Sequence, residues 1–216
     1  MSEADTKEGL KQILSVSNLS KSYGSKTVLK DVTFELREGE CLAMIGYNGA
    51  GKTTLLKIVL GLAKQQSGEV KFFGKEKLDD NVKQHIGYLP EDITFYNYMT
   101  GYEVLKFYTK LKEANVDDIP RLIELVSLTD ATNIKVKNYS KGMRQRLGLA
   151  QALIGDIKLL FLDEPTTGLD PLGRQILFSI INNLRENGTA IVIISHMLAE
   201  IEENVDQLLV LNIDSI

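Results

Sequence analysis

One stretch of the chain, GYNGAGKTT, matches the phosphate-binding pattern G-x-x-x-x-G-K-[ST]. It lies between the strand-like run CLAMIG and the helical pattern KTTLLKIVLGLAK, which is the context that this pattern requires. Glycines let backbone N–H groups turn toward phosphate oxygens, Lys52 can reach the β- and γ-phosphates, and the Thr53 hydroxyl can bind Mg²⁺. We therefore predict a nucleotide-binding loop made of Gly46, Tyr47, Asn48, Gly49, Ala50, Gly51, Lys52, Thr53 and Thr54.

Two adjacent acids, Asp163 and Glu164, follow the apolar run LLFL. Because the carboxyl ends of parallel strands form the ligand crevice of an α/β sheet, we expect both carboxylates beside the phosphates. Asp163 would hold Mg²⁺ through its water shell, and Glu164 would orient or deprotonate the attacking water. The alternative is that the pair caps a helix or lies on the surface.

Three other side chains are weaker candidates. His196 follows the strand-like run TAIVIIS and could donate a hydrogen bond to the γ-phosphate, although it could instead cap the next helix. Tyr23, in KSYG, could stack on a base, with plain packing as the alternative. His85 has no comparable context, and we interpret it as a surface residue.

A second helix is predicted to begin like an anion site. The stretch KVKNYSKGMRQRLGLAQALIG has Ser140 and Gly142 at its start, and helix N-termini bind anions through free N–H groups and the helix dipole. The chain already has one phosphate loop, so this second helix start raises the question of whose phosphate it contacts.

The elements that would position these residues alternate between strands and helices. QILSVSNLSKSYG and VLKDVTFELREGE have the alternation of half-exposed antiparallel strands, whereas CLAMIG, KLLFLD and TAIVIIS are short buried strands. GEVKFFG, IGYLPE and DQLLVLN add strands, while GRQILFSIINNLREN and LAEIEENV add helices. This order predicts an α/β fold with a mainly parallel sheet, a small antiparallel β layer and an inserted α-helical subdomain at roughly 92–155.

The length, composition and charge of the chain restrict the classes of protein to which it can belong. With 216 residues and 44% apolar composition, residues 11–216 are expected to form a single domain, and the polar residues 1–10 are expected to be disordered. The net charge of −4 argues against broad nucleic-acid binding. The apolar runs fall short of the ~20 residues that span a bilayer, the first residues do not resemble a signal peptide, and the lone Cys41 is an ordinary core residue.

Together these motifs resemble the nucleotide-binding subunit of ATP-binding-cassette (ABC) transporters, across essentially the whole chain and in the order of that family. The phosphate loop matches GYNGAGKTT, the glutamine loop YLPE, the signature YSKGM, the acid pair FLDEP and the next loop GLD. The resemblance implies a P-loop NTPase cassette that hydrolyses ATP with Mg²⁺, and base stacking by Tyr23. Catalytic roles are implied for Lys52, Glu91, Glu164 and His196, and Mg²⁺ contacts for Thr53, Asp163 and Glu91.

The resemblance also answers the question of the second phosphate. Family members bind ATP between two subunits arranged head to tail, which implies that Ser140, Lys141 and Gly142 contact the nucleotide of a second copy and that Asp170 lies at the dimer seam. The sequence departs from the family where Glu91 replaces the usual glutamine. It also departs in the signature, where Lys141 and Met143 replace a glycine and a glutamine.

Finer features are similar to one branch of the family. IGYLPEDITFYNYMTGYEVL, NYSKGMRQRLGLAQALIGD and SHMLAEIE resemble the ATPase that supports copper-site maturation in nitrous oxide reductase, within the exporter branch. The implied partners are a second copy and a separate multispanning permease, with no nucleic acid, and the implied location is cytoplasmic, on the inner face of the membrane. The aromatic run TFYNYM could contact the permease or pack within the helical insert.

Two other functions compete with the transporter. One is a soluble cassette ATPase acting on nucleic acid or ribosomes, which usually carries two cassettes and basic linkers, whereas this chain has one signature and no basic run. The other is an unrelated P-loop kinase or GTPase. The chain lacks the guanine motif N-K-x-D, and a kinase would not explain YSKGM beside FLDEP, so the transporter ATPase is favoured.

Overall fold

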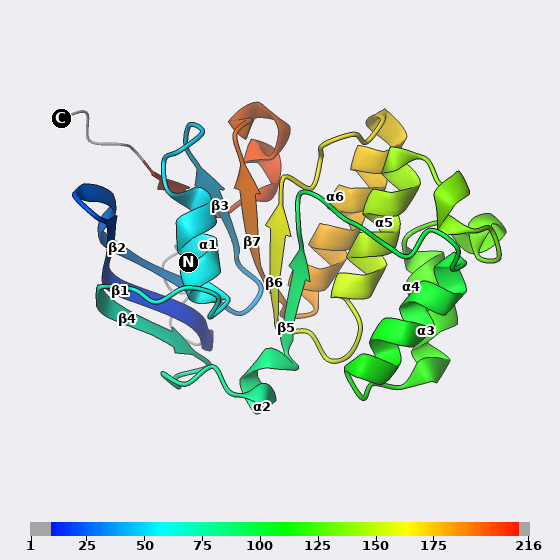
Figure 1. Cartoon of the computed structure of the whole chain (residues 1–216), viewed down its shortest axis with the longest axis horizontal. Helices are drawn as coiled ribbons and strands as arrows, with labels where there is room; N and C mark the ends of the chain where they lie inside the picture. The colour runs from blue at the N-terminus through cyan, green and yellow to red at the C-terminus, as the bar shows by residue number, and fades with distance from the viewer. Residues whose placement is uncertain (1–9, 212–216) are drawn as a thin grey trace, which may run out of the picture.

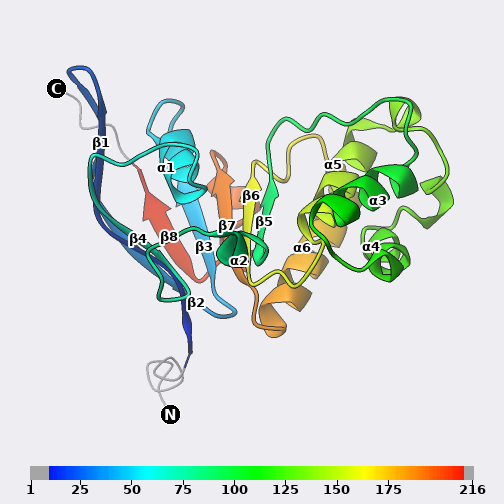
Figure 2. The same ribbon diagram turned by 60° about the horizontal axis from the view of Figure 1, so that its bottom comes forward.

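The computed structural model describes residues 10–211. Residues 1–9 and 212–216 lie outside the described part, and so does most of the segment 1–10 that the sequence predicts to be disordered. Figures 1 and 2 show an antiparallel sheet at one end of the molecule, a parallel sheet in the middle and a group of helices at the other end.

The antiparallel sheet begins the chain. Within the described residues, β1 (Gln12–Tyr23) lies between β2 (Lys26–Arg37) and β4 (Ser67–Phe72). The predicted alternation is present here, since Leu14 and Val16 are fully buried and pair across β1 with Phe72 and Val70 of β4. This layer confirms the small antiparallel sheet that the sequence predicts.

The parallel sheet has the strand order β5-β6-β7-β3-β8 in the described chain. Its strands are β3 (Cys41–Ile45), β5 (Ile86–Leu89), β6 (Leu159–Asp163), β7 (Ala190–Ser195) and β8 (Gln207–Val210). β3, β6 and β7 have nearly continuous apolar sequences because helices or the other sheet cover both of their faces. Their carboxyl ends lie at one edge, with the phosphate loop after β3 and the acid pair at the end of β6.

Alternate side chains of these strands enter two different hydrophobic cores. Leu159 and Phe161 of β6 pack with Leu55 of α1 (Lys52–Val59) and with the antiparallel sheet. Leu160 and Leu162 point to the opposite face and pack in the core formed by the helices. The twofold periodicity of a strand thus fixes α1 on one face of the sheet and the helical group on the other.

The remaining helices of the described chain are mostly those of the insert. They are α2 (Asp80–Lys83), α3 (Gly101–Leu111), α4 (Ile119–Leu125), α5 (Lys141–Ala152) and α6 (Pro171–Glu186), with 3₁₀ turns at Val116–Asp118, Thr129–Ala131, Val136–Asn138, Leu198–Glu200 and Glu202–Asn204. α3, α4 and α5 occupy the region in which the sequence predicts a helical insert. None of the described helices is long and apolar enough to cross a membrane.

Two predicted helices differ from the structure. The pattern KTTLLKIVLGLAK predicts a helix to residue 64, but α1 ends at Val59 because the backbone turns left-handed at Gly61, with φ 72°. LAEIEENV forms two 3₁₀ turns rather than one helix, separated at Ile201, whose φ of −126° is not helical. Ile201 is fully buried, so tertiary packing overrides the local helical pattern there.

Two segments of the insert pair through their backbones just before α3 and α5. The N–H groups of Val136 and Lys137 donate to the carbonyls of Met99 (2.8 Å) and Asn97 (3.0 Å), and Tyr102 N–H donates to the carbonyl of Thr132 (3.1 Å). We call residues 97–102 and 132–137 the paired segments. They connect the aromatic run after β5 to the start of α5.

Candidate active site

The phosphate loop has the backbone geometry of an anion cradle. Gly49 and Gly51 have φ values of 87° and 100°, which side chains rarely permit. A Cβ on Gly46 would lie 2.5 Å from the carbonyl oxygen of Leu211, so only glycine fits there. α1 begins at Lys52 with no side-chain cap and no acid in its first turn, which leaves its N–H groups and dipole for an anion.

Lys52 lies inside this loop rather than in solvent. The residue is 9% exposed, and its ammonium donates hydrogen bonds to the carbonyls of Gly46 and Tyr47. Both acceptors are neutral, so a phosphate can compete for the ammonium with a stronger charge-assisted bond. The Lys52 ammonium therefore lies at the position where a triphosphate would bind.

Glu164 has a strained backbone and a buried carboxylate. It has a positive φ of 47°, which is uncommon for a residue other than glycine and marks functional sites when the surrounding structure holds it. Its N–H donates to the carbonyl of Ile194 at 2.9 Å, which fixes this turn to β7, and the residue is only 7% exposed.

The carboxylate of Glu164 has two neighbours from the end of β7. Its Oε1 lies 2.8 Å from Nδ1 of His196, and Oε2 accepts a hydrogen bond from the Ser195 hydroxyl at 3.4 Å. The His196 side chain is about half exposed, so its second ring nitrogen, Nε2, is accessible to a ligand. Sequence reasoning selected Glu164 and His196 but missed Ser195, because no motif signals that β6 and β7 are adjacent.

The carboxylate of Asp163 is repelled by the negative charges of two neighbouring carboxylates. Burial, together with the charges of Glu91 and Glu164, raises the pKa of the Asp163 carboxyl to about 6, while Lys52 acts in the opposite direction. Burial and the charges of Asp163 and Glu91 likewise raise the pKa of Tyr88 to about 12. The charged side chains that act on Asp163 thus come from the phosphate loop and from the ends of β5 and β6.

This donor set fits Mg²⁺ held jointly with a nucleotide. No cluster of three or more His, Cys, Asp or Glu residues in the described chain could hold a metal alone. A hydroxyl from Thr53, at the start of α1, and a carboxylate from Asp163 suit Mg²⁺, which usually binds one or two carboxylates plus phosphates. A cation there would also relieve the repulsion that raises the pKa of Asp163. Glu91 is exposed just beyond β5 and remains a predicted additional contact.

Two candidate aromatic side chains, Tyr23 and Tyr47, are exposed. Tyr23, the last residue of β1, is half exposed, and the ammonium of Lys21 lies 5.0 Å from its ring centroid. Such an exposed ring is available for stacking, and its predicted role with a base stays a prediction. Tyr47 of the phosphate loop is 84% exposed, which its place in the motif did not indicate.

The second anion-type helix start belongs to α5. Ser140 caps α5 by accepting a hydrogen bond from Met143 N–H at 3.1 Å, and both Ser140 and Lys141 are exposed. Figures 1 and 2 place α5 and α1 on opposite sides of the parallel sheet. The starts of α5 and α6 line an open hollow of about 410 Å³, which includes Gly142 and Asp170.

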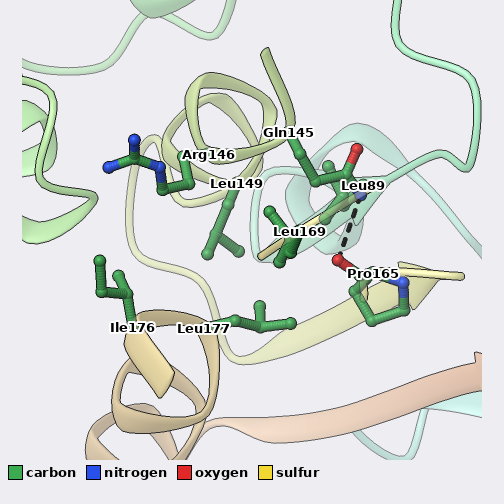
Figure 3. A pocket seen from close by; sticks show the side chains of 8 residues that line it. All are labelled: Leu89, Gln145, Arg146, Leu149, Pro165, Leu169, Ile176 and Leu177. Carbon is green, nitrogen blue, oxygen red and sulfur yellow. Dashed lines mark hydrogen bonds between the residues drawn. The ribbon is translucent and has the colours of Figure 1, made fainter. Parts of the chain in front are cut away.

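A buried amide joins α5 to the acid pair. Figure 3 shows Gln145 of α5 pointing to Pro165, whose carbonyl accepts its hydrogen bond at 3.5 Å. Leu89, Leu149, Leu169 and Leu177 surround this contact. Sequence reasoning missed Gln145, although a glutamine on the apolar side of a helix is the signal that could have found it. Pro165 directly follows Glu164, so α5 and the loop after the acid pair are linked within one chain.

Comparisons with known proteins identify this arrangement. The family model described as "ABC transporter" matches residues 29–167, which include the phosphate loop, the start of α5 and the acid pair. The chain belongs to the ABC transporter family. It is 41% identical over 206 residues to the uncharacterized ABC transporter ATP-binding protein YhcH of Bacillus subtilis, covering 94% of this chain and 68% of YhcH.

Other ABC proteins show the same similarity. The lantibiotic transport ATP-binding protein SrtF of Streptococcus pyogenes is 40% identical over 194 residues, with 90% of this chain and 84% of SrtF covered. A solved ATP-binding subunit of an ABC transporter superposes with a TM-score of 0.84 at 30% identity, covering 93% of this chain and 86% of that one. The chain is thus an ABC ATP-binding subunit with the ABC ATPase fold, and its enzymatic class is ATP hydrolysis in transport.

Proposed function

We propose that this ABC subunit hydrolyses Mg-ATP between two copies arranged head to tail and that this dimerisation powers a separate transmembrane subunit of an exporter. The observation that carries the proposal is the start of α5. A Cβ on Gly142 would meet Gly168 O at 3.6 Å and Leu169 Cδ2 at 3.7 Å, which are ordinary contacts. Packing within the chain therefore does not require glycine at position 142, whereas the close approach of a phosphate from another copy does.

Each half of the proposed site supplies what the other lacks. One copy offers the phosphate loop with Lys52, the acid pair and His196, and the second offers the exposed N–H groups of α5 at Ser140 and Gly142. Donors that approach the γ-phosphate from outside are present only when ATP joins the copies. Asp170, which lines the same hollow and caps α6, would lie at the seam.

Four side chains and their neighbours take part in the proposed reaction. Glu164 accepts a proton from, or orients, the attacking water, and His196 and Ser195 hold its carboxylate. Lys52 leaves the loop carbonyls and neutralises charge on the β- and γ-phosphates. Thr53 and Asp163 would hold Mg²⁺, which supplies charge neutralisation at the phosphates when bound.

The proposed membrane partner would dock near the aromatic run. Tyr96, Tyr98 and Phe107, which we call the aromatic patch, are exposed, whereas Phe95 of the same run is buried. Phe95 thus packs within the helical insert, whereas contact of the exposed Tyr96 and Tyr98 with a permease is part of this proposal. A permease contact there would place the chain at the cytoplasmic face of a membrane.

The names of relatives support a role in transport. Beside SrtF, the bacitracin transport protein BcrA of Enterococcus faecalis is 38% identical over 202 residues, covering 91% of this chain and 65% of BcrA. These relatives are named for transport of peptide antibiotics, and the cargo of this chain is not thereby assigned. The narrower resemblance to copper-site maturation in nitrous oxide reductase stays a prediction that these comparisons do not test.

The dimer is tested in a hydrolysis-deficient background. Glu164→Gln should slow hydrolysis by roughly 10²- to 10⁴-fold while ATP stays bound, so ATP should convert monomer to dimer. Adding Gly142→Asp should place a carboxylate against the partner's phosphate and abolish that dimer, while each monomer still binds ATP. Light scattering after size exclusion, with nucleotide binding on the same samples, measures both effects.

A double variant that still dimerises with ATP would rule out contact between α5 and the partner's nucleotide. The membrane role is tested separately by pull-down from solubilised membranes. Recovery of a multispanning protein supports the transporter, whereas recovery of RNA or ribosomes supports a soluble cassette ATPase.

A further inference from the structure

The turn that carries Glu164 is held from several sides. Its N–H donates to the carbonyl of Ile194 at 2.9 Å, and its carboxylate contacts two side chains at the end of β7. The carbonyl of the next residue, Pro165, accepts a hydrogen bond from the Gln145 amide of α5 at 3.5 Å, the long limit for such a bond. A positive φ at a residue other than glycine persists only where the surrounding structure holds it. Each of these contacts therefore affects where the carboxylate lies.

Gln145 is an unusual residue for the place that it occupies. It is 6% exposed, and Figure 3 shows its amide among the side chains of Leu89, Leu149 and Leu169. Within the described residues, its amide has Pro165 as hydrogen-bond partner. A buried amide destabilises a protein unless it is hydrogen-bonded, whereas an apolar side chain of similar size has no such cost. Packing alone therefore does not favour glutamine at this position.

A water molecule is a poor substitute for this bond. The cavity beside Gln145 has a volume of about 10 Å³, which is at the lower limit for one water. Its lining is mostly apolar, with Leu149, Leu169 and Leu177 among the side chains, and a buried water needs roughly two to four polar partners. Removal of the Gln145 amide would therefore leave the Pro165 carbonyl without this donor and without a water in its place.

The packing of α5 fixes the position from which Gln145 extends. A Cβ on Gly148, about one turn after Gln145, would lie 2.9 Å from Cδ1 of Leu89 in β5. The backbone of α5 thus lies close against that strand. Because the amide extends from a helix packed on the sheet, it can hold the Pro165 carbonyl at a defined place relative to the sheet.

We propose that Gln145 is a positioning residue for ATP hydrolysis, whose amide holds the Pro165 carbonyl and so keeps the Glu164 carboxylate in its catalytic orientation. The proposal rests on the role of Glu164 proposed above. Gln145 acts through the backbone of the turn and lies outside the phosphate loop. It therefore determines the rate of hydrolysis and not the binding of ATP.

The first test measures hydrolysis and ATP binding in Gln145→Met, which keeps the length of the side chain and removes the donor. We expect kcat to fall by about 10- to 100-fold, because a displacement of about 1 Å at a catalytic group has an effect of that order. ATP affinity should stay close to that of the wild type. Gln151→Met is the matched control, since it makes the same change on the same helix at a partly exposed glutamine away from the cavity.

A second test separates positioning from a general loss of structure. In the Glu164→Gln background, Gln145→Met should lower the residual turnover by less than about twofold, because the carboxylate that Gln145 positions is already absent. A general disturbance of the ATP site would lower turnover in both backgrounds. Melting curves and ATP binding on the same samples show that each variant is folded.

Gln145→Glu gives a third measurement, because a protonated carboxyl can donate to the Pro165 carbonyl and an ionised one cannot. Its kcat relative to wild type at the same pH should rise as pH falls from about 8.5 to about 6, since burial raises the pKa of a carboxyl into this range. This variant decides the question if Gln145→Met does not fold.

The inference is overturned if folded Gln145→Met keeps the wild-type kcat, or if its loss is equally large in the Glu164→Gln background. A relative kcat of Gln145→Glu that does not change with pH overturns it as well. In these cases Glu164→Gln alone still slows hydrolysis, and the role of Glu164 survives. If Glu164→Gln keeps the wild-type turnover, the proposed role of Glu164 fails and that of Gln145 fails with it.

Discussion

The Lys52 ammonium is the cation that the phosphate loop keeps ready for a ligand. We expect Lys52→Ala to weaken Mg-ATP binding and to lower hydrolysis at least about 100-fold, because no other side chain of the loop carries charge. Lys57→Ala, on the exposed side of the same helix, is the control and should retain activity. Unchanged turnover in purified Lys52→Ala would refute the assignment of the phosphate loop.

Asp163 should make stability depend on pH in the absence of Mg²⁺. Its pKa rises from 3.8 to about 6 in the folded protein, so ionisation destabilises the fold, and the destabilisation develops as pH rises through that window. Asp163→Asn should therefore raise the free energy of unfolding at pH 8 in chelator by about 1 to 2 kcal/mol, after allowance for solvent screening. Below about pH 3, where the carboxyl is protonated in both the folded and the unfolded state, the difference should vanish.

Melting temperatures at the two pH values measure this effect, with Asp92→Asn as a control at an exposed acid. Wild-type Mg²⁺-dependent ATP binding should weaken as pH falls through about 6, since Mg²⁺ requires the ionised carboxylate. Equal stability of Asp163→Asn and wild type at pH 8 would contradict the repulsion described for this site.

For individual residues, the motifs predicted the functional side chains that follow the strands. They did not predict which other side chains these would contact. The spacing around Lys52 and the placement of Asp163 and Glu164 after an apolar run were sufficient to predict a phosphate site. The contact of Glu164 with Ser195 depends on the adjacency of β6 and β7, which are far apart in sequence. The positive φ of Glu164 is likewise a tertiary effect, because glutamate has no local preference for it.

At the scale of elements, α3 and α5 are connected through one tyrosine. The Tyr139 hydroxyl donates to the carbonyl of Ala131 at 2.7 Å, and a Cβ on Gly101, the first residue of α3, would lie 2.3 Å from that hydroxyl oxygen. We expect Gly101→Ala to destabilise the protein by about 1 to 3 kcal/mol through this clash. Tyr139→Phe should cost about 1 to 2 kcal/mol through the lost hydrogen bond.

The two substitutions should not be additive. Without the hydroxyl, the alanine methyl has more room, and alanine is the better helix former, so Gly101→Ala should cost much less in the Tyr139→Phe background. Urea unfolding of all four members of the cycle measures the coupling. Additive costs would show that the hydroxyl does not set the distance between the helix start and Tyr139.

Element types were predictable where periodicity was strong. The strands around Leu160 and Ile193 and the helix around Leu177 follow from apolar runs and helical spacing. The end of α1 was not predicted, since the pattern continues beyond Gly61, where the left-handed backbone terminates the helix. Local periodicity carries no information about such a turn or about the packing that fixes Ile201.

At the scale of the whole molecule, head-to-tail pairing should bring together two exposed apolar side chains. Tyr47 of the phosphate loop is 84% exposed, and Leu172, beside the hollow at the start of α6, is 65% exposed. Exposed apolar groups beside complementary halves of a site are expected to be covered by an interface. In the Glu164→Gln background, Tyr47→Cys mixed with Leu172→Cys should therefore cross-link with ATP and a short bismaleimide.

The native cysteine does not interfere with this measurement. Cys41 is fully buried, and burial raises the pKa of its thiol to about 12, so it reacts too slowly to contribute. Each single variant alone serves as the control, because pairing of Tyr47 with Leu172 requires both cysteines. Cross-linking that is equally efficient with ADP would contradict an interface formed by ATP.

The paired segments have an evolutionary consequence. Their hydrogen bonds run from the N–H groups of Val136 and Lys137 to the carbonyls of Met99 and Asn97, so these bonds do not depend on the identity of the side chains. Substitutions at the exposed positions of these segments can accumulate without breaking the connection between the aromatic patch and the start of α5. Under the proposed permease contact, a lineage can thus change the membrane protein it recognises while inheriting the same backbone linkage to its ATP site.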